Sequence, residues 1–267
     1  MQTLRIAICL LALTLPQLAA SEQVTAELHL SKSQVVPGGS LVAAVHLRMA
    51  PGWHVYWRNP GDSGLPTNVT WGLPPGFTAG ELRWPTPQRF EQGGLVSFGY
   101  GNELWLTTVI QVPDQTAQEP VTISANLRWL ACLEACVPGS AALSAPLSIS
   151  DVDATDASAL ALEQGLAAQS YPSNEAPYRC TAHITPNEVT LKLHPLSDKP
   201  THPASLSFYP ASEGVIQLAA AQRWTPGPIP QLTLQRAAGT KVPEPLEGLL
   251  VADDDRAWHI SASRAQE

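Results

Sequence analysis

The clearest chemical signal in the sequence is a pair of cysteines, Cys132 and Cys136, separated by three residues. The pair follows a strand-like segment from Val121 to Leu130. If the intervening residues form a hairpin loop, the cysteines face each other across the first pair of the ladder, where Cβ atoms lie about 4.5–5.5 Å apart. A disulfide prefers a Cβ separation of about 3.8 Å, which is shorter than the distance across such a pair. We therefore expect the bond to close with some strain, and strained, exposed disulfides exchange readily.

The short loop between the cysteines also favours an exchangeable bond. Closing roughly five residues stabilises the fold by only about 2 kcal/mol in the chain-entropy model, and a structural disulfide gains more from a longer span. Two alternatives stay open. One is a fixed surface disulfide without turnover. The other is a Cys₃His zinc site in which Cys132 and Cys136 join Cys180 and His183, a pair with C-x₂-H spacing.

The composition of the 267-residue chain favours β structure. Its 25 prolines argue against a mostly helical fold, because proline lacks an N–H and breaks helix interiors. A hydrophobic content of 44% excludes intrinsic disorder. The net charge of −8 excludes the basic surface typical of nucleic-acid-binding proteins, so we expect no nucleic-acid partner.

The segment 22–152 is predicted to form an antiparallel β-sandwich. Apolar and polar residues alternate along its strand-like stretches, and turn signals such as Pro51-Gly52 and Gly93-Gly94 separate them. The cysteine pair lies at the end of one such stretch. The expected strands are Val24 to Leu30, Leu41 to Met49, Leu104 to Val112 and Val121 to Leu130.

A helical linker, 153–172, and a second, smaller β-sandwich, 173–267, are expected to follow. The stretch Asp156 to Gln169 is rich in alanine and leucine, and Asp156 is a suitable N-cap. Strand-like sequence resumes after this helical stretch. The segments are Tyr178 to Ile184, Val189 to Leu193, Ala204 to Phe208, Gln231 to Gln235 and Leu249 to Ala252.

The first residues, 1–21, are typical of a secretory signal peptide. Arg5 supplies the positive region, Ile6 to Leu15 the apolar run, and Leu18 to Ser21 small residues for cleavage. No later stretch reaches 18 uncharged apolar residues, so the protein is not expected to span a membrane after signal removal. Export places it in an oxidising compartment, the periplasm, where disulfides persist.

The first predicted domain contains four distinctive motifs: PGWHVYWRNPGDSGLP at 51–66, WPTP at 84–87, FGYG at 98–101 and WLACLEACVP at 129–138. Together and in this order they resemble the N-terminal periplasmic domain of the DsbD family of thiol:disulfide interchange proteins, most closely its ScsB-like branch. The second predicted domain resembles the extra β domain of that branch more weakly.

The resemblance implies an all-β protein of two immunoglobulin-like β-sandwich domains joined by a short helical linker, with the cysteine pair at one edge of the first. It implies that Cys136 forms mixed disulfides and that Cys132 resolves them, without a metal or an organic cofactor. It also implies an aromatic loop that caps the oxidised pair. Phe98 and Tyr100 stand where this cap would fall, and ordinary sandwich packing is the alternative for both.

The resemblance also implies the partners. In that family a membrane domain reduces the disulfide, and the dithiol then reduces periplasmic proteins with thioredoxin-like folds. Full-length members continue into a membrane domain and a thioredoxin-like domain. This sequence reaches Glu267 with neither, so we expect a separate membrane protein as electron donor.

Several other residues have two interpretations each. His54 acts on a thiol or only fills a hydrogen bond. Arg58 stacks on Trp57 or stabilises a thiolate. The stretch 61–64, GDSG, copies a serine-protease motif, but no aspartate precedes it as the protease order requires, so a glycine turn is expected. Cys180 lies in a strand-like segment, which favours a buried thiol over a reactive one.

Two functions of different classes follow. The leading hypothesis is a soluble periplasmic thiol–disulfide interchange protein that relays electrons through Cys132 and Cys136, serving cytochrome c biogenesis or copper stress. It would act as a thiol-disulfide oxidoreductase of the protein-disulfide reductase type. The alternative is a non-catalytic β-sandwich interaction module with a structural Cys132–Cys136 disulfide.

Overall fold

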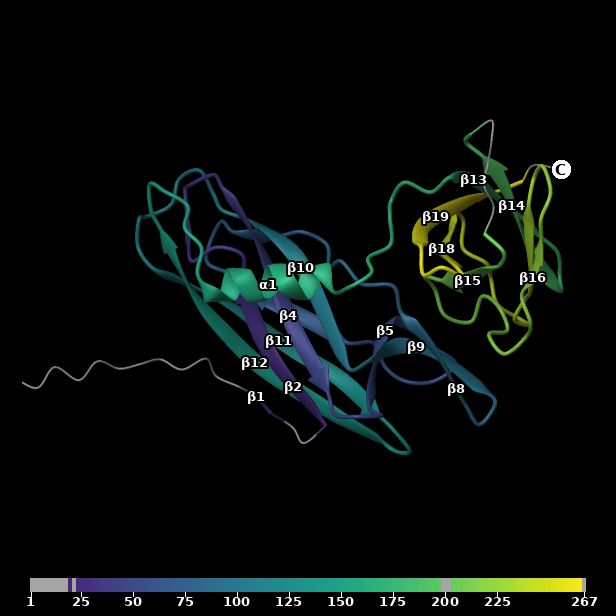
Figure 1. Cartoon of the computed structure of the whole chain (residues 1–267), viewed down its shortest axis with the longest axis horizontal. Helices are drawn as coiled ribbons and strands as arrows, with labels where there is room; N and C mark the ends of the chain where they lie inside the picture. Colours follow the sequence, from purple (N-terminus) through teal and green to yellow (C-terminus); the bar gives the residue numbers. More distant parts are fainter. Residues whose placement is uncertain (1–18, 21–22, 198–202, 266–267) are drawn as a thin grey trace, which may run out of the picture.

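The computed structural model describes residues 19–20, 23–197 and 203–265, which form two β-sandwich domains joined by a helix (Figure 1). This confirms the predicted all-β fold class of two immunoglobulin-like sandwiches with a short helical linker. The predicted signal peptide, 1–21, lies outside the described residues except for Ala19–Ala20, which form strand β1 and pair with the next strand.

One sheet of the first domain carries long antiparallel strands whose inner faces are apolar. Val45 and Leu47 on one strand and Leu104 and Leu106 on its neighbour are fully buried, as the alternation of side chains along a strand requires. The strand order is β1-β2-β4-β10-β7. The strands are β1 (Ala19–Ala20), β2 (Val24–Leu30), β4 (Ser40–Met49), β10 (Glu103–Gln111) and β7 (Thr78–Ala79).

The other sheet of the first domain carries the cysteines. Its order is β3-β12-β11-β5-β9-β8, and β6 also pairs with β11. Strands β11 and β12 form the long hairpin in Figure 1. The strands are β3 (Gln34–Val35), β5 (His54–Gly61), β6 (Asn68–Gly72), β8 (Gln88–Gln92), β9 (Leu95–Gly101), β11 (Val121–Cys132) and β12 (Cys136–Ile149).

Helix α1 (Ala157–Ala167) lies within the predicted linker and packs on the outer face of the first sheet. Asp156 is its N-cap, and its carboxylate accepts hydrogen bonds from the backbone N–H groups of Ser158 and Ala159. Leu162 is buried against Trp105 of β10. A Cβ atom at Gly165 would overlap the Trp105 ring, so glycine is what lets the helix lie this close to the sheet.

The second domain is built on one path of seven strands that closes over its own core. Strands β13 and β19 pair in parallel and join its two halves. The order is β15-β18-β19-β13-β14-β17-β16. The strands are β13 (Tyr178–Ile184), β14 (Glu188–Pro195), β15 (Leu206–Pro210), β16 (Arg223–Thr225), β17 (Gln231–Gln235), β18 (Leu246–Ala252) and β19 (Ala257–Arg264).

The two domains share a continuous apolar core at their contact. The Phe98 ring of β9 lies 4.5 Å from the Tyr209 ring, centroid to centroid. The side-chain amide of Asn59 on β5 donates to the carbonyl oxygens of Pro210 and Ser212, at 2.7 and 3.2 Å. Because these groups are buried, the contact fixes how the second domain sits on β5 and β9.

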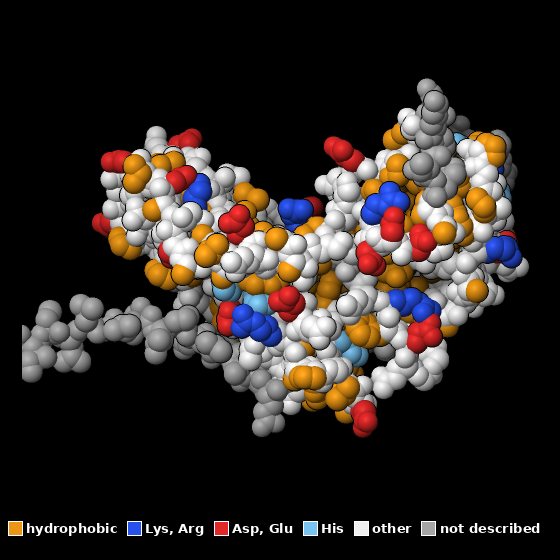
Figure 2. Space-filling model, viewed as in Figure 1, with side chains coloured by type: hydrophobic (Ala, Val, Ile, Leu, Met, Phe, Trp, Pro, Cys, Tyr) orange, Lys and Arg blue, Asp and Glu red, His pale blue; other side chains and the backbone are white. Residues whose placement is uncertain are grey.

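The surface agrees with the charge expected from the sequence. Figure 2 shows two lobes with a hollow between them, and the Lys and Arg side chains on this face are scattered among acidic ones. They form no basic patch on the face shown. Among the described residues, no helix has both the length and the apolar character needed to cross a bilayer.

Candidate functional site

The two cysteines form a disulfide at the turn end of the β11–β12 hairpin. Cys132 is the last residue of β11 and Cys136 the first of β12; they pair directly in the ladder, with Cα atoms 4.1 Å apart. The loop between them is closed by a hydrogen bond from the Leu133 N–H to the Ala135 carbonyl. The predicted three-residue hairpin is confirmed. The zinc alternative is wrong for this state, because both sulfurs are bonded to each other and Cys180 is buried in the second domain.

The two sulfurs have unequal access to solvent. Cys132 is only 2% exposed, whereas Cys136 is exposed. The cause is the sheet order: β11 lies between β12 and β5, so Cys132 has His54 of β5 as its second neighbour. The other neighbour of β12 is β3, which pairs only at the far end of the strand, at Ser148 and Ile149. Of the two sulfur-bearing residues, Cys136 is therefore the one open to solvent.

Tyr56 contacts the sulfurs from β5. Its hydroxyl donates to Cys132 Sγ at 2.9 Å and lies 3.9 Å from Cys136 Sγ. Burial raises the pKa of Tyr56, so the phenol keeps its proton and stays a donor at neutral pH. Tyr56 is not among the site residues predicted from the sequence. The signal was its position two residues after His54, which puts both side chains on one face of a strand.

His54 lies directly beside Cys132 in the sheet and is 8% exposed. Its ring stacks on Phe90 of β8 at 4.4 Å and meets the Tyr56 ring edge-on at 5.2 Å. Burial lowers the pKa of His54, so the ring is neutral at pH 7. The structure therefore brings this predicted accessory residue to the site, where it supports Tyr56. A direct action on a thiol stays a prediction.

The β8–β9 hairpin leans over the cysteine loop. The Gln92 amide donates to the Leu133 carbonyl at 3.3 Å, and Phe90 of the same hairpin covers His54. Around this contact Leu95, Leu133 and Val137 are exposed apolar side chains. They give the exposed sulfur of the site an apolar border.

Phe98 and Tyr100, the predicted cap residues, lie on β9 and are 1% and 3% exposed. The Phe98 ring contacts Trp57 and, across the domain boundary, Tyr209. The Tyr100 hydroxyl donates to the Pro85 carbonyl. These contacts match the packing alternative for both residues. Shielding of the disulfide by Phe98 and Tyr100 stays a prediction, whereas the hairpin that carries them does reach the cysteine loop through other residues.

Arg58, the other predicted accessory residue, is placed between the domains. Its guanidinium carbon lies 5.3 Å from the centre of the Trp57 ring, which is the predicted stacking. It also lines a cavity of about 390 Å³ between the domains, together with Arg83 and His259. Within the described residues its contacts are here and not with either cysteine.

The GDSG stretch is a glycine turn, as expected, and it supports the site. Gly61 and Gly64 have φ angles of 93° and 104°, which L side chains rarely adopt. Asp62 accepts a hydrogen bond from the Val96 N–H, which ties the turn to β9. A Cβ atom at Gly64 would overlap the Tyr56 ring. The turn therefore packs against the residue that holds Cys132.

Comparison with known proteins gives this site a family. The profile described as "Thiol:disulfide interchange protein DsbD, N-terminal" matches residues 21–148, which include the disulfide and the strands around it. The first domain belongs to this DsbD family. Thiol–disulfide interchange is the activity for which the family is named, and the Cys132–Cys136 bond provides the group that it needs.

One solved structure extends the likeness to both domains. The N-terminal periplasmic domain of ScsB from Proteus mirabilis matches 92% of this chain and 95% of its own, with a TM-score of 0.67 and 16% identity. At that identity the match shows a shared two-domain fold. The DsbD N-terminal domain of Neisseria meningitidis, in its reduced form, matches 52% of this chain and 89% of its own, with a TM-score of 0.29 and 13% identity. No curated protein matches the sequence significantly.

Proposed function

We propose that this protein is a periplasmic thiol–disulfide interchange protein that relays electron pairs from a membrane reductase to thioredoxin-fold proteins through Cys132 and Cys136. The observation that carries the proposal is the unequal access of the two sulfurs: one exposed at a hairpin end, the other buried beneath Tyr56. A structural disulfide needs no such asymmetry. A sulfur that forms mixed disulfides must be accessible, and the sulfur that resolves them only needs to reach its neighbour.

The exchange is a sequence of two thiolate attacks. In the reduced protein the Cys136 thiolate attacks one sulfur of the partner's disulfide; a mixed disulfide forms, and the partner's second sulfur leaves as a thiolate. The Cys132 thiolate then attacks Cys136 Sγ. The Cys132–Cys136 bond forms, the mixed disulfide breaks, and the partner is released as a dithiol. Two electrons have moved to the partner, and the membrane reductase restores the dithiol by the reverse chemistry.

Tyr56 acts as a positioning residue in this scheme. A hydroxyl that donates to Cys132 Sγ favours the charged thiolate, and so lowers the cost of the state that must attack. His54 holds the Tyr56 ring from one side and Gly64 lets the turn approach it from another. The sulfur that resolves the mixed disulfide therefore has a fixed position and a permanent donor.

The surface around Cys136 suits a protein partner. Leu133 and Val137 lie on either side of the cysteine in the chain, and Leu95 lies on the neighbouring hairpin; all three are exposed. Apolar side chains at the centre of a small patch favour transient docking. By its resemblance to the family, the partner set includes proteins of cytochrome c biogenesis or of copper stress.

The test is to trap the mixed disulfide. Reduced protein is mixed with a thioredoxin whose resolving cysteine has been changed to serine and whose remaining cysteine is activated as a mixed disulfide. We expect Cys132→Ser to accumulate the covalent complex, and Cys136→Ser to give less than about a tenth as much. Cys180→Ser, the matched control, behaves as wild type. Trapping by Cys136→Ser equal to that by Cys132→Ser would contradict the assignment of Cys136.

The reduction potential distinguishes this proposal from the structural-disulfide alternative. We expect the Cys132–Cys136 bond to equilibrate with glutathione or thioredoxin buffers at a potential above about −300 mV. A value well below that range is typical of a structural disulfide. It would favour a non-catalytic interaction module.

A further inference from the structure

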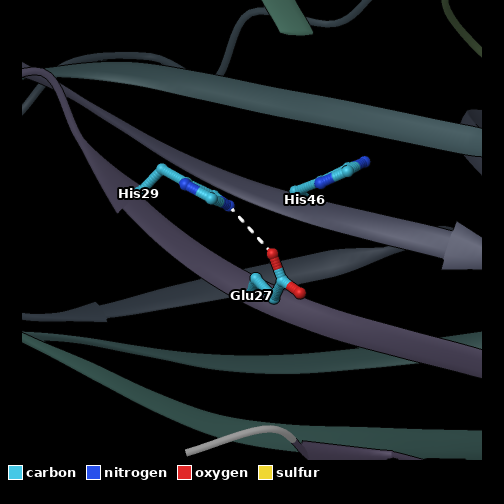
Figure 3. A group of neighbouring side chains, drawn as sticks. All are labelled: Glu27, His29 and His46. Carbon is cyan, nitrogen blue, oxygen red and sulfur yellow. Dashed lines mark hydrogen bonds and ion pairs between the residues drawn. The ribbon is translucent and has the colours of Figure 1, made fainter. Parts of the chain in front are cut away.

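A second cluster of reactive side chains lies on the opposite sheet, away from the disulfide. Glu27 and His29 are two residues apart on β2, so their side chains share one face of the sheet. His46 on β4 lies directly opposite Glu27 in the ladder. Figure 3 shows the three side chains on these neighbouring strands. One potential ligand atom from each lies within 4.8 Å of the other two.

The spacing within this cluster is that of metal ligands. Nε2 of His29 lies 3.2 Å from a carboxylate oxygen of Glu27. Two ligands on a tetrahedral Zn²⁺ with bonds of about 2.0–2.1 Å lie roughly 3.4 Å apart. In the metal-free protein this contact is a hydrogen bond from the His29 Nε2–H to Glu27. An ion would replace that proton at nearly the same separation, and His29 Nδ1, which is buried and has no hydrogen-bond partner within the described residues, can carry the proton instead. From a separation of up to 4.8 Å, His46 needs to approach by at most about 1.4 Å to complete a His₂Glu set, the composition of open zinc sites that keep one position for water.

The tautomer of His46 leaves a nitrogen for an ion. Its Nε2 lies 3.0 Å from a carboxylate oxygen of Glu103, and a carboxylate only accepts, so Nε2 carries the proton. Nδ1 then has a free lone pair; it is buried and, within the described residues, has no hydrogen-bond partner. In Figure 3 one ring nitrogen of His46 points away from Glu27 and His29, and the other lies on their side.

A carboxylate that accepts from the second nitrogen of a histidine is a usual support of metal-binding histidines, because it fixes the tautomer and the ring orientation. Here Glu103 itself accepts from the Trp105 indole N–H, and the Trp105 ring stacks on His46 at 3.8 Å. His46 is 2% exposed. Burial, with a smaller effect of the Arg48 charge, lowers the pKa of His46 to about 4, so the ring is neutral at pH 7.

We propose that Glu27, His29 and His46 bind one divalent transition-metal ion of the Zn²⁺ class, with Glu103 as the positioning residue for His46. An ion reaches the site from the side of Glu27, whose side chain is 24% exposed. Arg48 bonds the second oxygen of Glu27 at 3.1 Å and adds a positive charge that opposes the ion. A purely structural cluster of stacked rings is the alternative that the test must exclude.

The test is calorimetric titration of ZnCl₂ into untagged protein with the Cys132–Cys136 bond oxidised and Cys180 changed to serine, so that no free thiol competes. We expect one Zn²⁺ per chain and no binding of Mg²⁺, which prefers oxygen ligands. His29→Gln and Glu27→Gln each weaken Zn²⁺ binding at least tenfold. His183→Gln, an exposed histidine in the second domain, is the matched control and leaves binding unchanged.

Two further variants test the site without replacing His46, because a substitution at this buried position would also disturb the fold. Glu103→Gln, which weakens the orienting hydrogen bond, is expected to reduce affinity about 10–100-fold. Arg48→Gln, at a position with a 56% exposed side chain, is expected to tighten binding because a competing charge is removed. Equal or weaker binding by Arg48→Gln counts against the site. Absence of Zn²⁺ binding, or binding that His29→Gln and Glu27→Gln leave unchanged, overturns the proposal.

Discussion

The cysteine turn and the Cys180 position place the same side chain in opposite environments. At the turn, Cys136 is exposed and Cys132 receives a hydrogen bond from Tyr56. Cys180, on β13, is 4% exposed, and burial raises its pKa to about 12. Its sulfur lies 4.0 Å from the Tyr178 carbonyl, in a buried setting.

The position in the sheet, and not the presence of a thiol, therefore decides whether a cysteine of this protein can exchange. A thiol in the middle of a buried strand pays the full cost of desolvating its thiolate, so it stays protonated and inert. A thiol at the end of a hairpin, with a free edge on one side and a polar donor on the other, stays available for exchange.

The largest expected effect is on thiol reactivity. In the reduced protein at pH 7.5, Cys136 should react with a disulfide reagent more than about a thousandfold faster than Cys180, because a pKa near 12 instead of an ordinary value of about 8.5 removes most of the thiolate. The time course of reagent release measures this. Cys180→Ser should lose only the thiol that appears after unfolding in guanidinium. Similar reaction rates for all the thiols of the wild type would contradict the contrast between the exposed Cys136 and the buried Cys180.

The next effect concerns the support of the turn. Gly64→Ala should destabilise the first domain by about 3 kcal/mol, since a Cβ atom there overlaps the Tyr56 ring and the φ of 104° is strained for alanine. Urea unfolding measures the loss. Gly93→Ala is the control: its φ is also positive, at 61°, but a Cβ atom there meets nothing within 4 Å. Equal losses in both variants would show that the Tyr56 contact contributes nothing.

The buried thiol should leave a signature at alkaline pH. The Cys180 pKa is raised from 9.0 to about 12 in the folded state, so above pH 9 the unfolded chain releases a proton that the folded chain keeps. Stability is therefore full below pH 9 and is lost as pH rises towards 12, by about 2 kcal/mol at pH 10.5. The stability difference between wild type and Cys180→Ala should narrow by that amount from pH 8 to pH 10.5. A constant difference would mean that Cys180 is not buried as described.

The smallest effect is on the redox equilibrium of the turn. The Tyr56 hydroxyl donates to Cys132 Sγ and so stabilises the reduced, thiolate form. Tyr56→Phe removes this donor, so the reduction potential should fall by about 20 mV, equivalent to roughly 1 kcal/mol. Equilibration with a glutathione buffer measures it. Tyr171→Phe, whose hydroxyl bonds the Trp105 carbonyl far from the disulfide, should leave the potential unchanged. A rise in Tyr56→Phe would contradict the role of the hydroxyl.

Local patterns were sufficient for much of the fold. The predicted strands Val24 to Leu30, Tyr178 to Ile184 and Gln231 to Gln235 match β2, β13 and β17, because simple alternation specifies a half-buried strand. The cysteine hairpin was predictable for a similar reason, since its geometry depends only on loop length. The burial of Cys180 followed from its strand.

The environment of the disulfide was not predictable, because it depends on pairing between distant segments. Tyr56 and Cys132 meet only because β5 pairs with β11, and 76 positions separate them in the chain. The packing of the β8–β9 hairpin against the cysteine loop is also a contact between distant segments. The sequence indicated the Gly93-Gly94 turn of this hairpin, but not the hydrogen bond between Gln92 and Leu133. Glu27, His46 and Trp105 lie side by side only because β2, β4 and β10 pair in the observed register, which the sequence does not reveal.

Strand β5 has one further consequence, because it runs from the sulfurs to the second domain. Tyr56 near one end holds Cys132, and Asn59, three residues further along, is anchored to two carbonyls of the other domain. Both anchors lie in the stretch of β5 where its pairing with β9 shifts register, between Tyr56 and Gly61. The position of the second domain is thus coupled to the disulfide through β5. Tilting the second domain requires the buried Asn59 amide to release its two carbonyls, and the same strand carries Tyr56, the donor to Cys132 Sγ.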